Sequence, residues 1–177
     1  MKLKNLLLSM CAVALISSCT KEDLKVSFDL PTGQIDFVVK QTTQAGAMQI
    51  DAQDLQYNLD SVCKANSISK DQITSMKIKE VFLDILDNNN TTFDIVNWAE
   101  AYVGATGKAD VLLAAKKPIG KDGVRTISLD LKDVELVDYI KANQMSFYAK
   151  GETNGPVKTD VPMRARVKFT ITGQIVE

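Results

Sequence analysis

The sequence of 177 residues contains no histidine, three cysteines and few aromatic side chains, 6% of the total. Without histidine, the chain has no Ser-His-Asp or Cys-His nucleophile system and no histidine-ligated metal site. The 21 Lys and Arg residues are balanced by 22 Asp and Glu residues, which argues against a protein that binds nucleic acid through net positive charge. With 45% hydrophobic and 24% charged residues, the composition is that of a folded protein.

The N-terminal hydrophobic run is too short to span a membrane. It covers the 11 residues from Leu6 to Ile16, whereas a spanning helix needs about 20 apolar residues. Lys2 and Lys4 precede the run, and Ser17 and Ser18 follow it. A basic start, a short apolar middle and small residues at the end are typical of a secretory signal peptide.

The segment Leu15-Ile16-Ser17-Ser18-Cys19 resembles the lipobox of bacterial lipoproteins, with Ile16 where that family prefers Leu. The resemblance implies that residues 1–18 are a lipoprotein signal peptide, that Cys19 carries a diacylglyceryl group, and that its new amine receives a fatty acid such as palmitate. Two or three acyl chains anchor a protein firmly, since each buried CH₂ contributes about 0.8 kcal/mol. The alternative is an ordinary signal peptide that is cleaved elsewhere.

Residues 19–24 are predicted to be the lipidated cysteine and a charged tether. Within them, Lys21-Glu22-Asp23 resembles the surface-export signal of Bacteroidota lipoproteins. The resemblance implies a lipid-anchored protein in the bacterial outer membrane that faces the cell surface. The alternative is a charged tether without export function on a periplasm-facing lipoprotein.

Residues 25–177 are predicted to form a single domain that is rich in β-strands. Apolar residues alternate with polar ones from Met163 to Ile171, which is the period of a half-buried strand. Shorter alternations predict strands at 26–30, 35–39, 48–52, 127–131 and 145–149. A strand over 78–85 needs a β-bulge near Lys79-Glu80, because its alternation shifts by one residue there. Segments 98–105 and 109–116 are predicted to form a hairpin that turns at Thr106-Gly107.

Helical spacing of apolar residues predicts helices at 53–65 and 133–142, and the form Ser69-x-x-Gln72 predicts a further short turn. The two helical segments look alike, since each follows a strand and ends in Lys-Ala-Asn; they are either related halves or a chance match. The expected fold is a mainly β, antiparallel β-sandwich, Ig-like or jelly-roll-like, of about nine strands with two or three short crossover helices.

No pattern of residues in the sequence favours a catalytic or metal site. Cys63 is the one thiol outside the N-terminal 19 residues, and it lies on the apolar side of a predicted helix. The form Ser-x-x-Lys occurs at Ser61 and at Ser67 without the partner motifs of penicillin-recognising enzymes. The acids around the loop at 87–90 lack the glycine spacing of an EF-hand calcium loop. We therefore expect no catalytic residues, no metal and no cofactor.

Three candidate sites remain outside the anchor. Arg164, Arg166 and Lys168 share one face of the last strand, where they form either an anion-binding face or a solvated face that deters strand pairing. The same alternatives hold for the lysines and arginine at 116, 117, 121 and 125. Asp60-Ser61-Val62 resembles the O-glycosylation acceptor of Bacteroidota, which would make Ser61 the modified residue.

These observations predict a lipid-anchored, non-catalytic envelope lipoprotein that acts as a binding or structural module, such as an accessory of glycan or nutrient capture, an adhesin or an envelope component. Its partners are the membrane and a glycan or protein at the envelope, and not nucleic acid. The alternative is a periplasm-facing lipoprotein that binds a lipid or other apolar ligand inside the sandwich. The sequence specifies neither the ligand nor the oligomeric state.

Overall fold

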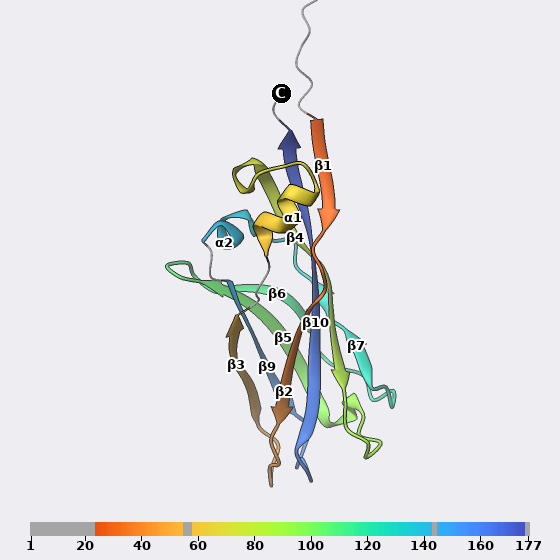
Figure 1. Ribbon diagram of the computed structural model, residues 1–177. Coiled ribbons are helices and arrows are strands. Elements are labelled where there is room, and N and C mark those ends of the chain that lie inside the picture. Colours follow the sequence, from red (N-terminus) through yellow and green to blue (C-terminus); the bar gives the residue numbers. More distant parts are fainter. Residues whose placement is uncertain (1–23, 55–57, 143–144, 176–177) are drawn as a thin grey trace, which may run out of the picture.

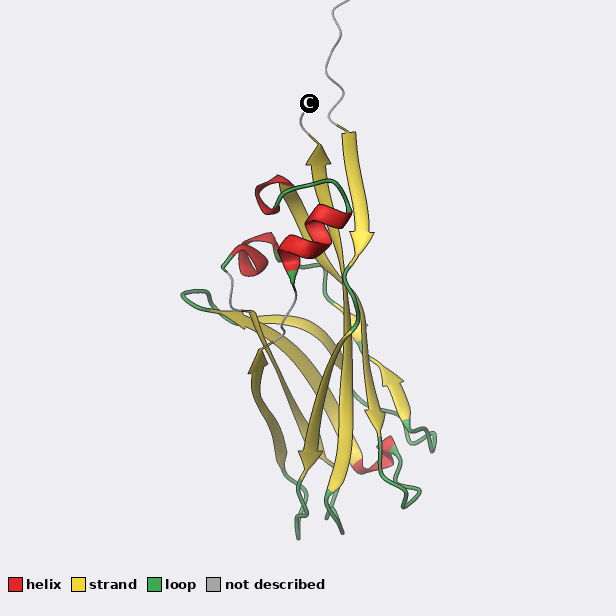
Figure 2. Cartoon of the chain, in the orientation of Figure 1, coloured by secondary structure: helices red, strands yellow, loops and turns green. Residues whose placement is uncertain are grey.

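The computed structural model describes residues 24–54, 58–142 and 145–175 and shows two antiparallel, five-stranded sheets packed face to face (Figures 1 and 2). Two short α-helices and two 3₁₀ turns complete the described part of the chain. The predicted β-sandwich is therefore confirmed.

The first sheet is organised around β10 (Val161–Ile175), a strand of 15 residues. On one side β10 pairs with β4, and β4 pairs with β7; on its other side it pairs with β1 near its end and with β2 near its start. The bounds are β1 (Leu24–Asp29), β2 (Gly33–Val39), β4 (Ile73–Ile85) and β7 (Thr126–Ser128). Every second residue of β10 from Val161 to Gly173 is buried, as the alternation predicted.

The predicted bulge lies in β4. Lys168 of β10 pairs with Glu80, but the next residue, Phe169, pairs with Ile78. Lys79 is therefore the extra residue on β4. The bulge keeps Ile78 and Val81, whose spacing does not fit a regular strand, both buried against the second sheet.

The second sheet has the order β3-β9-β5-β6-β8. The bounds are β3 (Ala47–Asp54), β5 (Val96–Ala105), β6 (Val111–Lys116), β8 (Asp130–Leu131) and β9 (Met145–Thr153). The predicted hairpin is formed by β5 and β6, and Gly107 at its turn has a φ of +75°, a value that glycine adopts without strain.

The strand predicted over 127–131 is divided between the two sheets, so the described residues form ten strands where about nine were expected. Ile127 pairs with β4 of the first sheet, whereas Asp130 and Leu131 pair with β6 of the second. Leu129 lies buried at the corner between them, and its backbone N–H donates to the carbonyl of Val81 at 3.0 Å. The alternation continues through this corner because both short strands face the same core.

The helices are shorter than predicted. They are α1 (Leu59–Ala65) and α2 (Val137–Lys141), with 3₁₀ turns η1 (Lys70–Gln72) and η2 (Phe93–Ile95). Residues 53 and 54, predicted to be helical, belong to β3, because strand pairing with β9 extends to Asp54. In the predicted turn at Ser69, the backbone N–H of Ser69 donates to the Gln72 side chain at 2.7 Å.

Only one of the two helices carries the chain between the sheets. The α1 segment connects β3 to β4 and so crosses between them as predicted, but α2 connects β8 to β9 within the second sheet. The Glu135 carboxylate holds α2 in place, since it accepts hydrogen bonds from the backbone N–H of Met76 at 2.7 Å and of Val137 at 3.1 Å. Burial raises the pKa of Glu135, but these bonds outweigh that effect and leave the pKa below its usual value.

The inner faces of the two sheets form one continuous hydrophobic core. Phe147 of the second sheet and Phe169 of the first are fully buried, and Phe93 of η2 is buried at the end of the sandwich. The start of β1 and the end of β10 lie together at the top of Figure 1, where Leu24 pairs with Ile175. The connections β2–β3, β4–β5, β6–β7 and β9–β10 lie toward the opposite, lower end.

Candidate functional site

The residues of the predicted lipid anchor, Cys19, and of the predicted export signal, Lys21, Glu22 and Asp23, lie outside the described residues. The described chain begins a few positions later with Leu24 at the start of β1. The anchor and the export signal stay predictions from the sequence.

Ser61 lies in the first turn of α1 with an exposed side chain. Its backbone N–H donates to the Asn58 side chain at 3.0 Å, which caps the helix. Ser61 and Lys168, two of the residues singled out in the sequence, line the same open depression of about 520 Å³, together with the Pro31-Thr32 bend. The structure thus brings one modification candidate next to the basic strand.

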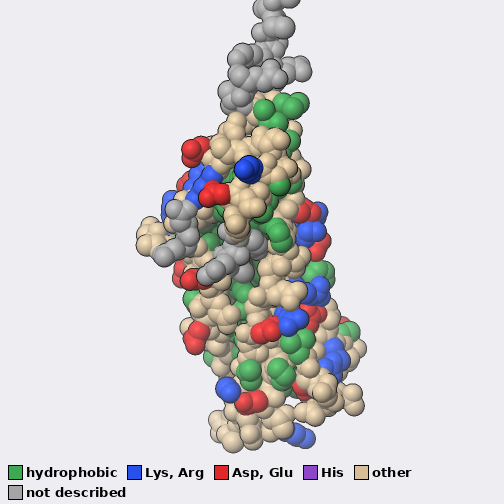
Figure 3. All heavy atoms as spheres, viewed as in Figure 1, with side chains coloured by type: hydrophobic (Ala, Val, Ile, Leu, Met, Phe, Trp, Pro, Cys, Tyr) green, Lys and Arg blue, Asp and Glu red, His purple; other side chains and the backbone are tan. Residues whose placement is uncertain are grey.

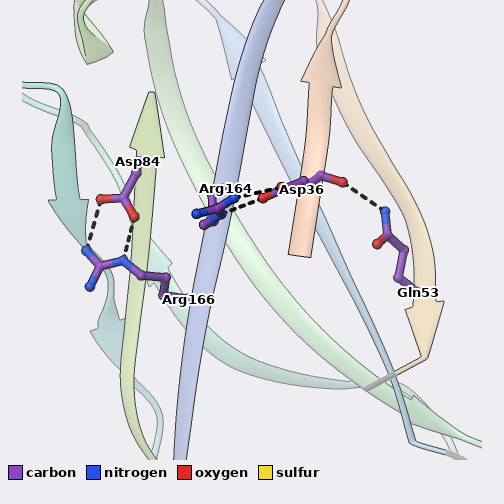
Figure 4. A network of polar contacts seen from close by, with 5 residues as sticks. All are labelled: Asp36, Gln53, Asp84, Arg164 and Arg166. Atoms are coloured by element: carbon purple, nitrogen blue, oxygen red, sulfur yellow. Dashed lines mark hydrogen bonds and ion pairs between the residues drawn. The ribbon is translucent and has the colours of Figure 1, made fainter. Parts of the chain in front are cut away.

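The basic residues of β10 each face an acid of a neighbouring strand. Arg164 binds Asp36 of β2 through two hydrogen bonds of 2.6 and 2.8 Å, and Arg166 binds Asp84 of β4 through two of 2.5 and 2.9 Å (Figure 4). The Gln53 side chain of β3 adds a 3.3 Å bond to the Asp36 carbonyl and so links the two sheets. The guanidinium groups hold the pKa values of both carboxyls below their usual range.

Lys168, the third basic residue of this row, shares Asp29 of β1 with Lys79 of β4. The ammonium of Lys79 lies 2.7 Å and that of Lys168 3.2 Å from the Asp29 carboxylate, which also accepts a 2.8 Å bond from the Thr170 hydroxyl. The Lys79 contact is the largest cause of a strongly lowered pKa at Asp29.

We call the three sets of contacts around Arg164, Arg166 and Lys168 the ion-pair ladder. Each cation of the ladder contacts an acid. Because Lys79 and Lys168 share Asp29, four cations face three carboxylates, so most of the positive charge of the row is neutralised. Figure 3 likewise shows basic and acidic side chains mixed over the visible face. The geometry therefore supports the structural interpretation of this row and gives an anion-binding face no support.

The second basic cluster of the sequence is dispersed. Lys116 donates to the carbonyl of Ser128, Lys117 lies 5.0 Å from the Trp98 ring centre, and Arg125 pairs with Asp87 at 3.1 Å. Lys121 lies exposed in the β6–β7 connection.

The loop acids and Cys63 are also accounted for by structure. Asp84 pairs with Arg166, Asp87 with Arg125, and Asp94 accepts a 3.0 Å bond from the Gly123 backbone. Within the described ranges, no three acidic or cysteine side chains are placed to hold a metal ion. Cys63 is 1% exposed, and burial raises the pKa of its thiol, which disfavours the reactive thiolate.

An aromatic cluster on the outer face of the second sheet has no counterpart in the sequence-based expectations. Tyr102 of β5 and Tyr148 of β9 stack with ring centres 5.0 Å apart and planes 4° apart. The Lys150 ammonium lies 5.2 and 5.6 Å from the two ring centres. Burial, followed by the hydrogen bond to Asp110, raises the pKa of Tyr148 to about 12. The pairing of β5 with β9 places the two tyrosines opposite each other, a relation that needs the register to be known.

The interior of the sandwich is tightly filled where β2 and β3 approach each other. The apolar space between Phe37, Met48, Leu83 and Met163 has a volume of about 20 Å³. That volume holds about one water molecule, whereas sites for small molecules measure roughly 300–1,000 Å³. This space therefore has no room for a lipid.

No protein-family model matches the sequence, and no curated protein matches it. Similar solved structures are viral capsid proteins. A decameric BFDV capsid protein is 12% identical with a TM-score of 0.42, covering 85% of this chain and 99% of that chain. A 60-mer BFDV capsid protein is 9% identical with a TM-score of 0.38, covering 86% and 94%. Desmodium yellow mottle tymovirus protein is 6% identical with a TM-score of 0.27, covering 88% and 91%.

Identities and TM-scores this low carry no argument about function. In the part of the chain that the structure describes, neither helix has the length and apolar character of a membrane span.

Proposed function

We propose that the protein is a lipid-anchored, non-catalytic lipoprotein of the bacterial outer membrane, displayed at the cell surface, whose β-sandwich acts as a binding or structural module. The observation that carries the proposal is the segment Leu15-Ile16-Ser17-Ser18-Cys19, which lies a few residues before the first strand. Lys21-Glu22-Asp23 supports the outward orientation. Ser61, exposed on α1, is the O-glycosylation acceptor in this proposal.

The arrangement of the fold supports a module that works at a distance from the membrane. The domain begins at Leu24, at one end of the sandwich, and four connections between strands lie toward the other end. An anchor that precedes Leu24 tethers the first end, so the lower end of Figure 1 is the one free to meet a partner.

The alternative, a periplasm-facing protein that holds an apolar ligand between the sheets, lacks such support. It needs a cavity, and the apolar space between β2 and β3 measures about 20 Å³. Sheets that are packed this closely have to separate before a lipid enters.

The test is to replace Cys19 by Ala and follow the protein in fractionated cells. We expect the wild-type protein in the outer-membrane fraction and the Cys19→Ala protein in soluble fractions. Ser18→Ala is the matched control, since it keeps a small residue before the cysteine and should leave the protein in the membrane. Retention of the Cys19→Ala protein in the membrane would contradict the lipid anchor.

Protease added to intact cells tests the orientation separately. We expect the wild-type domain to be degraded, because it faces outward, and a variant with Lys21, Glu22 and Asp23 all replaced by Ala to be protected. A wild-type domain that is protected in intact cells but degraded in lysed cells would place it in the periplasm.

A further inference from the structure

A concave pocket of about 270 Å³ is lined by residues of the β4–β5 and β9–β10 connections and by Val161 of β10. Both connections lie at the end of the sandwich away from the start of β1 (Figure 1). The pocket is more than ten times larger than the space between the sheets at β2 and β3. Its volume lies just below the usual range of roughly 300–1,000 Å³ for small-molecule sites, so a single small ring is the size of ligand that fits.

The β4–β5 wall of the pocket is held by a buried acid. The side chain of Asp87 is 4% exposed, accepts a hydrogen bond from the Thr91 hydroxyl, and lies 3.1 Å from the Arg125 guanidinium. Arg125 also donates to the Asp87 carbonyl and to the Ile85 carbonyl. These contacts fix the loop that presents Asn90 and Thr92 to the pocket.

The β9–β10 wall is held by long-range contacts of three of its residues, Asn154, Val157 and Asp160. Asp160 pairs with Lys40 at 2.8 Å and accepts a 2.9 Å bond from the backbone of Gln41. The Asn154 side chain donates to the Asp94 carbonyl at 2.8 Å, and the Val157 carbonyl accepts from the Thr42 backbone at 3.0 Å. Both walls are therefore fixed before a ligand arrives, which lowers the entropic cost of binding.

The lining combines three kinds of group. Ile95 and Val161 contribute an apolar surface. Asn90, Thr92 and Thr159 contribute an amide and two hydroxyls whose side chains form no hydrogen bond with other described residues. Lys158 is the one charged residue of the lining; among the described residues its ammonium has no acidic partner, unlike the paired cations of the ion-pair ladder.

We propose that this pocket binds a single acidic sugar residue, a hydroxylated ring that carries one carboxylate. The Lys158 ammonium complements the carboxylate, the free amide and hydroxyl groups complement the ring hydroxyls, and the apolar surface faces the C–H groups of the ring. A bare inorganic anion can pair with the ammonium and accept from the hydroxyls, but it has no ring to contact the apolar surface or fill the pocket. This inference rests on the proposed function, because it identifies the ligand class of the binding module and places the site away from the membrane anchor.

Binding is tested with the full chain purified in detergent micelles, by isothermal titration calorimetry and by NMR shifts of the sugar. The acidic probes are D-glucuronic, D-galacturonic and N-acetylneuraminic acid, with D-glucose, D-galactose and inorganic phosphate as comparison ligands. We expect saturable binding of at least one acidic sugar, with a Kd of roughly 1 mM, and at least about tenfold weaker binding of the neutral sugars and of phosphate.

Two lysine variants locate the site. Lys158→Met should weaken binding of the acidic sugar by about tenfold or more, since it removes a charge-assisted hydrogen bond. Lys121→Met is the matched control, because it removes an exposed lysine from the neighbouring β6–β7 connection and should leave the affinity unchanged. Thr92→Val and Thr159→Val should also weaken sugar binding, because each removes a hydroxyl that complements the ring hydroxyls.

Three results would overturn the inference: no binding of any of the three acidic sugars, binding that Lys158→Met leaves unchanged, or phosphate that binds as tightly as the sugar. None of them bears on the lipid anchor, which the Cys19→Ala fractionation tests independently. The two experiments therefore distinguish a wrong proposal about the pocket from a wrong proposal about the lipid anchor.

Discussion

The outer faces of the two sheets are covered in different ways. The first sheet carries the ion-pair ladder, in which each basic residue of β10 binds an acid of an adjacent strand. The second sheet carries the stacked pair Tyr102–Tyr148, with Lys150 beside both rings. Both arrangements join neighbouring strands by contacts between side chains, one through charge and one through aromatic surface. A row of like charges in a sequence is therefore no sign of a free charged surface.

The ion pairs of the ladder, which we call its rungs, differ in how far their acidic side chains are exposed to water. The Asp84 side chain, bound by Arg166, is 16% exposed, whereas the Asp36 side chain, bound by Arg164, is 60% exposed. Water strongly screens the attraction within an exposed ion pair, whereas it screens a half-buried ion pair much less. Arg166 also lies over the Phe82 ring, 4.8 Å from its centre, and Arg164 has no such contact with the described aromatic residues.

Substitutions on the inner faces are expected to lower the free energy of unfolding most, because the inner faces of both sheets are apolar and share one core. Phe147→Ala and Phe169→Ala should each lower the free energy of unfolding by about 3–5 kcal/mol, because both side chains are fully buried in one core. Urea unfolding of the full chain in detergent measures both. A loss below about 1 kcal/mol for one of them would show that its sheet contributes little to the shared core.

The next effect distinguishes the rungs of the ladder. Arg166→Met should cost about 1–2 kcal/mol at pH 7, since it leaves the half-buried Asp84 carboxylate without its guanidinium. Because Arg166 lowers the pKa of Asp84 in the folded protein, this stabilisation is present above the ordinary carboxyl pKa of about 3.9 and is lost as the pH falls through the folded value. Unfolding measured at several pH values should show the variant and the wild type converging in acid. A constant difference would assign the loss to packing on Phe82.

A smaller effect tests the aromatic face. Tyr148→Leu should cost about 1 kcal/mol, because it removes the stacked ring pair and the 2.9 Å bond from the Tyr148 hydroxyl to Asp110. Tyr139→Leu is a useful control, since Tyr139 lies on α2 and outside the stacked pair. Denaturation of both variants gives the comparison. Equal losses would indicate that the stack adds nothing beyond an ordinary tyrosine contact.

The smallest effect is expected at the exposed rung. Arg164→Met should leave the unfolding midpoint unchanged within error, because its partner Asp36 is mostly in water. Raising the salt concentration screens the Arg164–Asp36 pair further, and this should change the stability of the wild-type protein little. A loss as large as that of Arg166→Met would mean that exposure does not separate the two rungs.

Much of this fold could be predicted from the sequence, because alternation of apolar residues reports directly which face of a strand is buried. Met163 to Ile171, the bulge beside Glu80 and the turn at Gly107 all follow from that period and from backbone preferences. The corner at Leu129 is not visible in the sequence, since a chain that passes from one sheet to the other around a shared core keeps the same alternation.

The sites were less predictable because they depend on which strands are neighbours. Arg164, Arg166 and Lys168 share a face as expected, but their acidic partners lie on three strands far away in the sequence. The same is true of Tyr102 and Tyr148, which pair only when β5 and β9 are placed side by side. Ser61 and Lys168 share a depression for a similar reason, and only the anchor at Cys19 is local enough to be proposed from consecutive residues.

The most direct test of the lipid anchor is mass spectrometry of the N-terminal peptide of the protein isolated from membranes. We predict a peptide that begins at Cys19, with a diacylglyceryl group on its sulfur and a fatty acid on its amine. An unmodified N-terminus, or a mature chain that begins at any other residue, would contradict it.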